Sequence, residues 1–200
     1  MDKVEMVKTT YKTLYAAGPD PSMVAVPELA VFAASGEGDP RGSAVFEAAT
    51  GALYACSYGL KMGSKKAGRA DWTVMPLEGD WWTDDMARFS LDARGIWKWT
   101  LYIVQPSFVP DDEARQAIED ARRKKGLEVD VRFERAPAHK AAHIMHRGPY
   151  SAEPPTIKRL HGFIESSGVS LTGRHREIYL SDPRRTAPER MKTIIRQPVA

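Results

Sequence analysis

The segment Ile96-Trp-Lys-Trp-Thr-Leu-Tyr-Ile-Val-Gln-Pro106 decides how this chain is organised, because its ending recurs near the C-terminus as Gln197-Pro198. Branched and aromatic residues dominate the segment, which is typical of a β-strand, and the proline ends it. The residues before the second Gln-Pro, Met191–Arg196, form another predicted strand that stops in the same way. Two strands with the same uncommon ending in comparable places indicate an internal repeat.

The elements that precede these two strands also follow the same order. In the first half they are a strand at 23–35, a glycine-rich turn, a helix whose apolar face runs from Phe46 to Leu60, and a strand at 71–77 ending in the turn Glu78-Gly79-Asp80. In the second half they are a strand at 141–146, the turn Arg147–Tyr150, a helix whose apolar face runs from Ile157 to Ile164, and a strand at 176–181 ending at Asp182-Pro183. Shared turn residues alone could arise by chance, because few residue types form turns. Together with the Gln-Pro endings they favour two β-α-β-β units.

The predicted fold is therefore α+β, with two tandem β-α-β-β repeats forming one pseudo-symmetric antiparallel sheet in a single domain over 1–200. The repeats span 19–106 and 128–200, a helix over 1–17 precedes the first, and a helix over 110–126 connects the two. We expect the helices on one face of the sheet and a ligand cleft on the other.

The connecting helix carries a charge run with a structural explanation. It begins with Asp111, Asp112 and Glu113 and ends with the basic run 122–125 before Gly126. Acidic residues at the start and basic residues at the end complement the helix dipole. An anion-binding patch is the alternative interpretation of the basic run.

Composition narrows the function classes. The 200 residues carry 29 basic and 26 acidic side chains, a net charge of +3, so charge does not call for a nucleic-acid partner. A single cysteine, Cys56, removes any disulfide framework and fits a reducing, cytoplasmic setting. No apolar run approaches the roughly 20 residues of a membrane span, and the charged N-terminus does not resemble a signal peptide.

Side-chain alternation selects candidate site residues on two strands. In the strand at 176–181, Ile178 and Leu180 form the apolar set and are predicted to face the helices. Glu177 and Tyr179 then project together from the opposite face. In the strand at 96–104, Trp97 and Trp99 share one face.

All five tryptophans of the chain lie between residues 72 and 99. One interpretation is a core beneath the loop at 80–96, with Glu177 exposed to solvent. The other is a concave aromatic pocket with Glu177 and a tyrosine at its floor. We favour the pocket, with Trp97 and Trp99 as its wall, Trp81 and Trp82 at its rim and Trp72 in the core.

Several catalytic constellations fail on spacing. The glycine-rich turn 36–42 lacks the spacing of a dinucleotide site, and its acidic residues would repel a pyrophosphate. His139, His143 and His146 do not share one strand face, and no cysteine or carboxylate completes a metal set. Cys56 lies on the apolar face of a helix and no nucleophile elbow occurs. We therefore expect neither a metal nor an organic cofactor.

Four segments resemble one known family, the GyrI-like small-molecule-binding proteins, and in particular its stand-alone bacterial branch without a DNA-binding domain. They are Trp72–Gly79, Trp97-Lys-Trp-Thr100 through Gln105-Pro106, His146-Arg-Gly-Pro-Tyr150 and Glu177-Ile-Tyr-Leu-Ser-Asp-Pro183. The resemblance implies tandem β-α-β-β units of the SHS2 type around a cleft. Relatives act as drug-sensing pockets of transcription regulators or inhibit DNA gyrase, and some stand-alone members hydrolyse cyclopropanoid cyclohexadienone genotoxins.

The resemblance also assigns roles. It implies that Glu177 is a pocket carboxylate surrounded by aromatic residues, with Tyr150 at the mouth of the second helix. In a hydrolase, Glu177 would activate water as a general base and Tyr150 or Tyr179 would stabilise a developing phenolate. The same residues would also bind aromatic or lipophilic cationic compounds without turnover. The sequence leaves the natural ligand and homodimerisation open.

Overall fold

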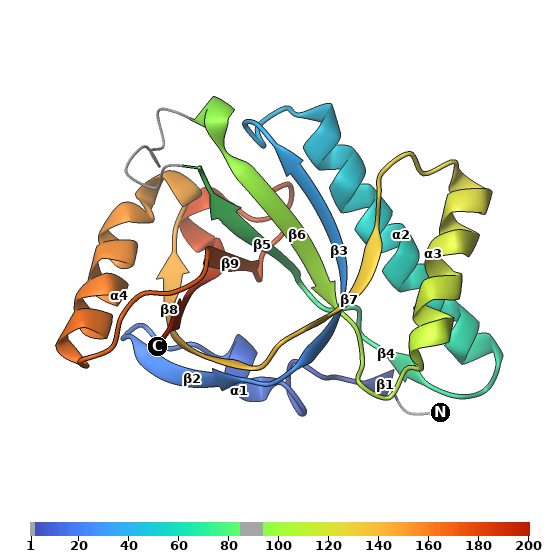
Figure 1. Ribbon diagram of the computed structural model, residues 1–200, viewed down its shortest axis with the longest axis horizontal. Coiled ribbons are helices and arrows are strands. Elements are labelled where there is room, and N and C mark those ends of the chain that lie inside the picture. The colour runs from blue at the N-terminus through green and yellow to red at the C-terminus, as the bar shows by residue number, and fades with distance from the viewer. Residues whose placement is uncertain (1–2, 85–93) are drawn as a thin grey trace.

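The computed structural model describes residues 3–84 and 94–200 (Figure 1). The helices in these residues are α1 (Lys12–Tyr15), α2 (Ala44–Lys66), α3 (Asp111–Lys125) and α4 (Pro154–Ser166), with short 3-10 turns at Arg94–Ile96, Tyr150–Ala152 and Pro188–Arg190. The strands are β1 (Lys3–Val4), β2 (Ser22–Val26), β3 (Leu29–Glu37), β4 (Asp71–Trp72), β5 (Leu77–Trp82), β6 (Lys98–Val104), β7 (Arg132–Ala136), β8 (His139–Arg147), β9 (His175–Tyr179) and β10 (Lys192–Val199).

Eight strands form one antiparallel, curled sheet in the order β2-β8-β10-β9-β5-β6-β3-β7 (Figure 1). Counted inward from the two edges of the sheet, the strands of one repeat occupy the same positions as those of the other. In these equivalent pairs β2 corresponds to β7, β8 to β3, β10 to β6 and β9 to β5. The two repeats therefore meet at the central pair β5 and β9. The predicted α+β fold with two repeats in one antiparallel sheet is confirmed, and each repeat has one strand more before its helix than predicted.

The first strand of each repeat pairs with a strand of the other repeat: β2 with β8, and β7 with β3. The strand predicted at 23–35 is two strands, because Pro27 separates β2, which pairs with β8, from β3, which pairs with β6 and β7. Pro137 separates β7 from β8 in the same way. Proline lacks the N–H that continues a ladder, so each chain turns there and changes partners.

Two local predictions differ from the structure. Glu78-Gly79-Asp80, predicted as a turn, lies inside β5 between β6 and β9. The helix expected over 1–17 is replaced by β1, a run of turns and the short helix α1. In both cases tertiary pairing outweighs local preference.

The side chains of Glu78 and Asp80 explain why β5 continues through that segment. Arg176 on β9 bonds Asp80, with Nε 2.6 Å from Oδ1, and lies 3.4 Å from Glu78. Tyr15 donates a hydrogen bond to the other Glu78 oxygen, and the Tyr102 hydroxyl donates to Asp80. These buried acidic groups are therefore partnered across the sheet rather than solvated in a turn.

Helices α2 and α4 lie on the same face of the sheet, which we call the helix face. On α2, Phe46 packs against Trp81 and Trp99, and Ser43 caps the first turn by accepting a hydrogen bond from the Phe46 N–H. On α4, Leu160 and Ile164 belong to a buried cluster with side chains of β8 and β10. Both helices thus bury their apolar stripes against the same sheet surface.

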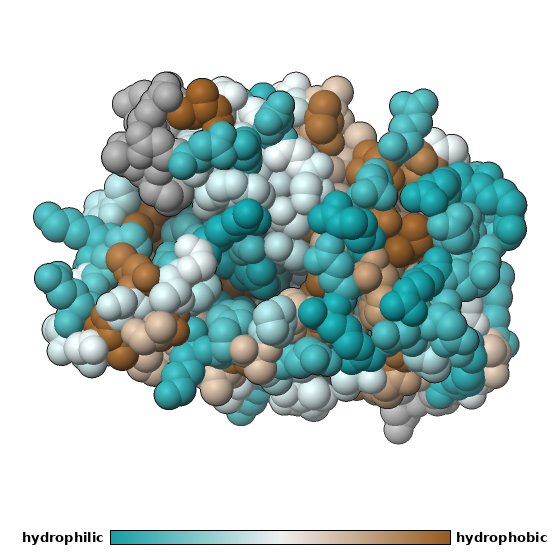
Figure 2. Space-filling model, in the orientation of Figure 1, coloured by the Kyte–Doolittle hydropathy of each residue, from teal (hydrophilic) through white to brown (hydrophobic). Residues whose placement is uncertain are grey.

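The opposite surface, which we call the far face, is partly covered by the N-terminal segment. The backbone carbonyl of Leu14 accepts a hydrogen bond from Arg196 on β10, and Tyr15 reaches Glu78 on β5. The sheet is consequently covered near its centre on both faces. In the view of Figure 2, teal hydrophilic side chains dominate the surface and brown ones form separate small groups.

Among the described residues, none of the helices is both long enough and apolar enough to cross a membrane.

Candidate functional site

The central strand pair positions the candidate carboxylate. Glu177 on β9 lies opposite Gly79 on β5, and His175 lies opposite Trp81. On the other side of β9, Glu177 faces Ile195, which belongs to the cluster beneath α4. Glu177 therefore lies on the helix face, near the meeting point of the two repeats.

The orientation expected for Glu177 and Tyr179, away from the helices, is wrong. Ile178 does point to the opposite side, but that side is the far face, where it is fully buried. Alternation separates the two sets of side chains correctly. It does not tell which set faces the helices when both faces of the strand are covered.

A second carboxylate that the sequence analysis missed lies beside Glu177. Glu153, at the N-terminal end of α4, is 4% exposed, and the Glu177 side chain is 16% exposed. Burial, together with the charge and hydrogen bonding of Glu177, raises the pKa of Glu153 to about 10. Glu153 therefore favours its protonated form near pH 7, beside the Glu177 carboxyl.

Two tyrosines border this carboxyl pair. Their rings meet edge to face, with the centroids of Tyr150 and Tyr179 5.7 Å apart. Burial and the nearby Glu177 charge raise the pKa of both hydroxyls. Tyr179 accepts a hydrogen bond of 2.8 Å from Trp81 Nε1, and both phenols stay protonated at neutral pH as hydrogen-bond donors.

A buried histidine lies on the other side of Glu177. His175 Nε2 is 3.5 Å from Glu177 Oε1. Burial first, and then the charge of His175, lower the pKa of His161 on α4. Glu177 is thus bordered by an imidazole as well as by phenols, a grouping suited to proton transfer.

An aromatic cluster adjoins the tyrosines. Trp81 is stacked on Phe46 at 6.0 Å between centroids and meets Trp97 edge to face at 5.5 Å. Phe46 also meets Trp99 at 5.3 Å, and Trp99 is completely buried. Its Nε1 has no hydrogen-bond partner within the described part of the chain. Trp81, Trp97 and Trp99 therefore gather around the start of α2, where all three are buried in the hydrophobic core rather than exposed as a wall or rim.

Trp82 is separated from this cluster. It neighbours Trp81 in β5 and so points to the far face, where the Arg174 guanidinium lies 3.4 Å from its ring centroid. Trp72 packs against Phe108 and is buried, as a core residue.

The structure brings Glu177, Tyr150, Tyr179 and Trp81 together and adds Glu153, His175 and Phe46. The sequence carried only a faint signal for Glu153, since an acidic residue at the start of a helix is ordinary. Phe46 was assigned to a helix core face, and nothing indicated that this face covers the tryptophans.

The histidines of β8 have separate structural roles. The His146 ring contacts Thr156 Oγ1 at 2.9 Å and the Pro149 carbonyl at 3.2 Å, which fixes the turn before Tyr150. His143 lies on the far face beside Arg196, and burial lowers its pKa to about 4. Within residues 3–84 and 94–200 no group of three or more His, Cys, Asp or Glu side chains is placed to hold a metal ion.

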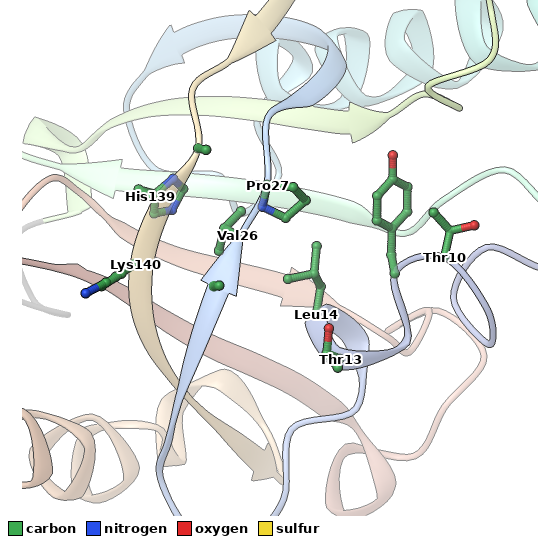
Figure 3. Close-up of a pocket in the computed structure, with 10 residues that line it drawn as sticks. Thr10, Thr13, Leu14, Val26, Pro27, His139 and Lys140 are labelled. Carbon is green, nitrogen blue, oxygen red and sulfur yellow. The ribbon is translucent and has the colours of Figure 1, made fainter.

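A cavity of about 600 Å³ lies away from the carboxyl pair, between α1, β2 and the start of β8. Figure 3 shows Leu14, Val26 and Pro27 along it, with His139 and Lys140 from β8. The site tyrosines adjoin the other end of β8, near His146, about 24 Å along the strand at 3.4 Å per residue. This cavity contains no carboxylate, so it is not the site built around Glu177.

Gly79 makes room for the hydrogen bond between the two halves. A Cβ at this position would lie 3.0 Å from Trp81 Nε1 and 3.2 Å from the Tyr179 hydroxyl. We expect Gly79→Ala to push these groups apart and destabilise the fold by about 1–3 kcal/mol, as overpacking does. Chemical denaturation measures this. Gly59→Ala, where a Cβ on α2 meets open space, is the matched control and should be neutral or slightly stabilising. Equal effects of the two substitutions would contradict the packing argument.

Comparisons with known proteins find a matching family and similar folds. A family model described as GyrI-like small molecule binding domain matches residues 19–200. A crystal structure of an uncharacterized conserved protein from Listeria innocua has 38% sequence identity and a TM-score of 0.89, covering 99% of this chain and 100% of that one. Another, described as a hydrolase from Listeria innocua, has 37% identity and a TM-score of 0.87, covering 100% of both chains.

The C-terminal domain of EcmrR has a TM-score of 0.60 over 90% of this chain and 97% of that one, but only 15% identity, and so shares the fold alone. A comparison with curated proteins finds no match.

Proposed function

The chain belongs to the family of GyrI-like small-molecule-binding domains, and from this membership we propose that it hydrolyses planar, electrophilic cyclopropane-dienone compounds. The observation that carries the proposal is the carboxyl pair Glu153–Glu177 bordered by Tyr150, Tyr179 and Trp81. A relative of 37% identity described as a hydrolase supports catalysis rather than binding alone.

The proposed reaction adds one water molecule to a spiro-cyclopropane conjugated to a dienone. Glu177 accepts a proton from water as the water oxygen bonds to a cyclopropane carbon. The strained carbon–carbon bond breaks, and its electron pair moves through the ring to the carbonyl oxygen, which becomes a phenolate. That oxygen then takes up one proton, so the net change is H₂O added and an aromatic ring formed.

Glu153 supports the proposed role of Glu177 as a general base. Because the raised pKa of Glu153 favours its protonated form, Glu153 is a hydrogen-bond donor to Glu177, the proposed general base. Two ionised carboxylates at this separation would repel each other, and this repulsion contributes to the raised pKa of Glu153.

The tyrosines suit the opposite end of the reaction. Tyr150 and Tyr179 keep their hydroxyl protons at neutral pH because their pKa values are raised. Tyr179 is hydrogen-bonded to Glu177, which leaves Tyr150 as the donor for negative charge on the former carbonyl oxygen. The half-buried Phe46, packed against the buried Trp81, offers aromatic surface to a flat substrate.

A binding module without turnover is the second candidate. A carboxylate in a site bordered by aromatic rings favours a lipophilic cation, through charge pairing and cation–π contacts. This candidate uses the same residues and differs only in whether a bond is broken.

Turnover stoichiometry separates the two candidates. We expect purified protein to convert many equivalents of a cyclopropane-dienone compound, followed by loss of the dienone absorbance and by mass spectrometry of the water adduct. Compound incubated without protein gives the background rate. Conversion that stops at one equivalent, or never exceeds background, would contradict hydrolysis and favour the binding module.

A further inference from the structure

The far face carries a groove that is distinct from the site around Glu177. Its volume is about 510 Å³, within the range of small-molecule sites. The lining includes Ser35, Trp82, Lys98, Thr100, Arg132 and Arg174, from β3, β5, β6, β7 and the segment before β9. Trp82 and Lys98 alternate with Trp81 and Trp99, so the groove and the carboxyl pair lie on opposite faces of the same strands.

Arg174 is positioned as the anchor of this groove. Its guanidinium lies 3.4 Å from the Trp82 ring centroid, which holds the plane of the group while leaving its N–H edges free. Within the described part of the chain it makes no ion pair. A guanidinium held flat with unused N–H groups is suited to bidentate binding of a phosphate or carboxylate.

Two further cationic side chains line the groove, and each uses only some of its N–H donors in hydrogen bonds within the protein. Lys98 Nζ lies 2.7 Å from Asp84, whose side chain is 81% exposed. Arg132 uses Nε on Glu134 at 2.8 Å and Nη2 on the Ser35 hydroxyl at 3.1 Å. The groove therefore gathers three positive side chains around one opening.

The floor of the groove is made of hydroxyl groups. Ser35 Oγ and Thr100 Oγ1 lie 3.0 Å apart on paired residues of β3 and β6. Glu37 and Glu134 also line the groove. Hydroxyls and carboxylates can accept further hydrogen bonds from ligand hydroxyl groups, which an aliphatic or bare aromatic ligand lacks.

We propose that this groove binds a phosphate monoester of a polyhydroxylated compound, the chemical class of sugar phosphates. The phosphate group pairs with Arg174 and Lys98, and the ligand hydroxyls bond the floor and the two glutamates. The rim of Trp82 offers an apolar surface to the carbon skeleton. Glu37 and Glu134 repel a ligand that is negatively charged and has no hydroxyl groups to donate hydrogen bonds to them.

The test follows the Trp82 indole N–H signal by NMR, assigned with Trp82→Phe. The probes are glucose 6-phosphate, inorganic phosphate and glucose. We expect a saturable shift with glucose 6-phosphate and affinities at least about tenfold weaker for the other two, because each lacks half of the recognised groups. Equal affinity for inorganic phosphate would overturn the ligand class, and no shift with any probe would overturn the site.

The matched variants are Arg174→Gln and Arg123→Gln. Arg123 lies on the exposed surface of α3, paired with Asp120, and is not part of the groove. We expect Arg174→Gln to weaken glucose 6-phosphate binding by about tenfold or more through loss of the bidentate pair, and Arg123→Gln to leave it unchanged. Equal losses would show attraction by overall charge and contradict a built site. Dienone turnover does not enter this readout, so the two proposals stand or fall separately.

Discussion

Glu177→Gln is expected to lower the turnover of a cyclopropane-dienone compound by about 10²–10⁴-fold, the usual contribution of a general base. Glutamine keeps the size of the side chain and accepts the hydrogen bond from Glu153, but it takes no proton from water. Because the chemical step loses its base while the aromatic surfaces remain, we expect kcat to fall and KM for a neutral compound to change little. Initial rates of dienone loss measure both constants.

Glu165→Gln is the matched control for this substitution. Glu165 is an exposed residue near the end of α4, so its replacement tests the effect of removing one carboxylate from the protein as such. We expect full turnover from this variant. Wild-type turnover by Glu177→Gln would exclude Glu177 as the base, and so would a fall of the same size in both variants.

Glu153→Gln is expected to stabilise the protein progressively as the pH rises. The Glu153 pKa is about 10 in the folded state, against about 4.3 for a glutamate in an unfolded chain. Between these values the folded state holds one proton more than the unfolded state, so the free energy of unfolding falls with pH by roughly 1.4 kcal/mol per unit. Glutamine has no such proton, and its amide N–H₂ donates to Glu177 as the protonated acid does.

The measurement is chemical denaturation of parent and variant between pH 4.5 and pH 8. We expect similar stabilities near pH 4.5 and a gap in favour of the variant of roughly 4–5 kcal/mol by pH 8, the slope times the interval. Subtracting the parent's free energy of unfolding from the variant's at each pH cancels the contributions of groups that titrate alike in both. The control Glu165→Gln should differ from the parent by the same small amount at every pH. A gap independent of pH would mean that Glu153 is ionised in the folded protein.

The internal repeat is the part of the fold that could be predicted from the sequence. The paired Gln105-Pro106 and Gln197-Pro198 endings, with the matching order of helix and strand patterns, predicted two β-α-β-β units. The exchange of β2 and β7 between the halves was not predictable, because it depends on which partner each strand meets after Pro27 and Pro137. Strand identity is a local property, whereas strand pairing joins residues distant in sequence.

The candidate site divides in the same way. Alternation selects Glu177 and Tyr179, the family resemblance adds Tyr150, and the clustering of tryptophans adds Trp81. The structure places these four together. Trp82 was grouped with them but lies on the far face, since its neighbour Trp81 occupies the helix face. Treating β5 as ending in a turn concealed this alternation.

The sequence alone determined the repeat, the helix stripes and which side chains share a strand face, because these follow from the periodicity of the backbone. The tertiary structure decided which face the helices cover and brought Glu153 from α4 beside Glu177 from β9. It also raised the pKa of Glu153, which favours the protonated form of that carboxyl. Burial and the proximity of like charges set proton affinity, and both exist only after distant segments have packed together.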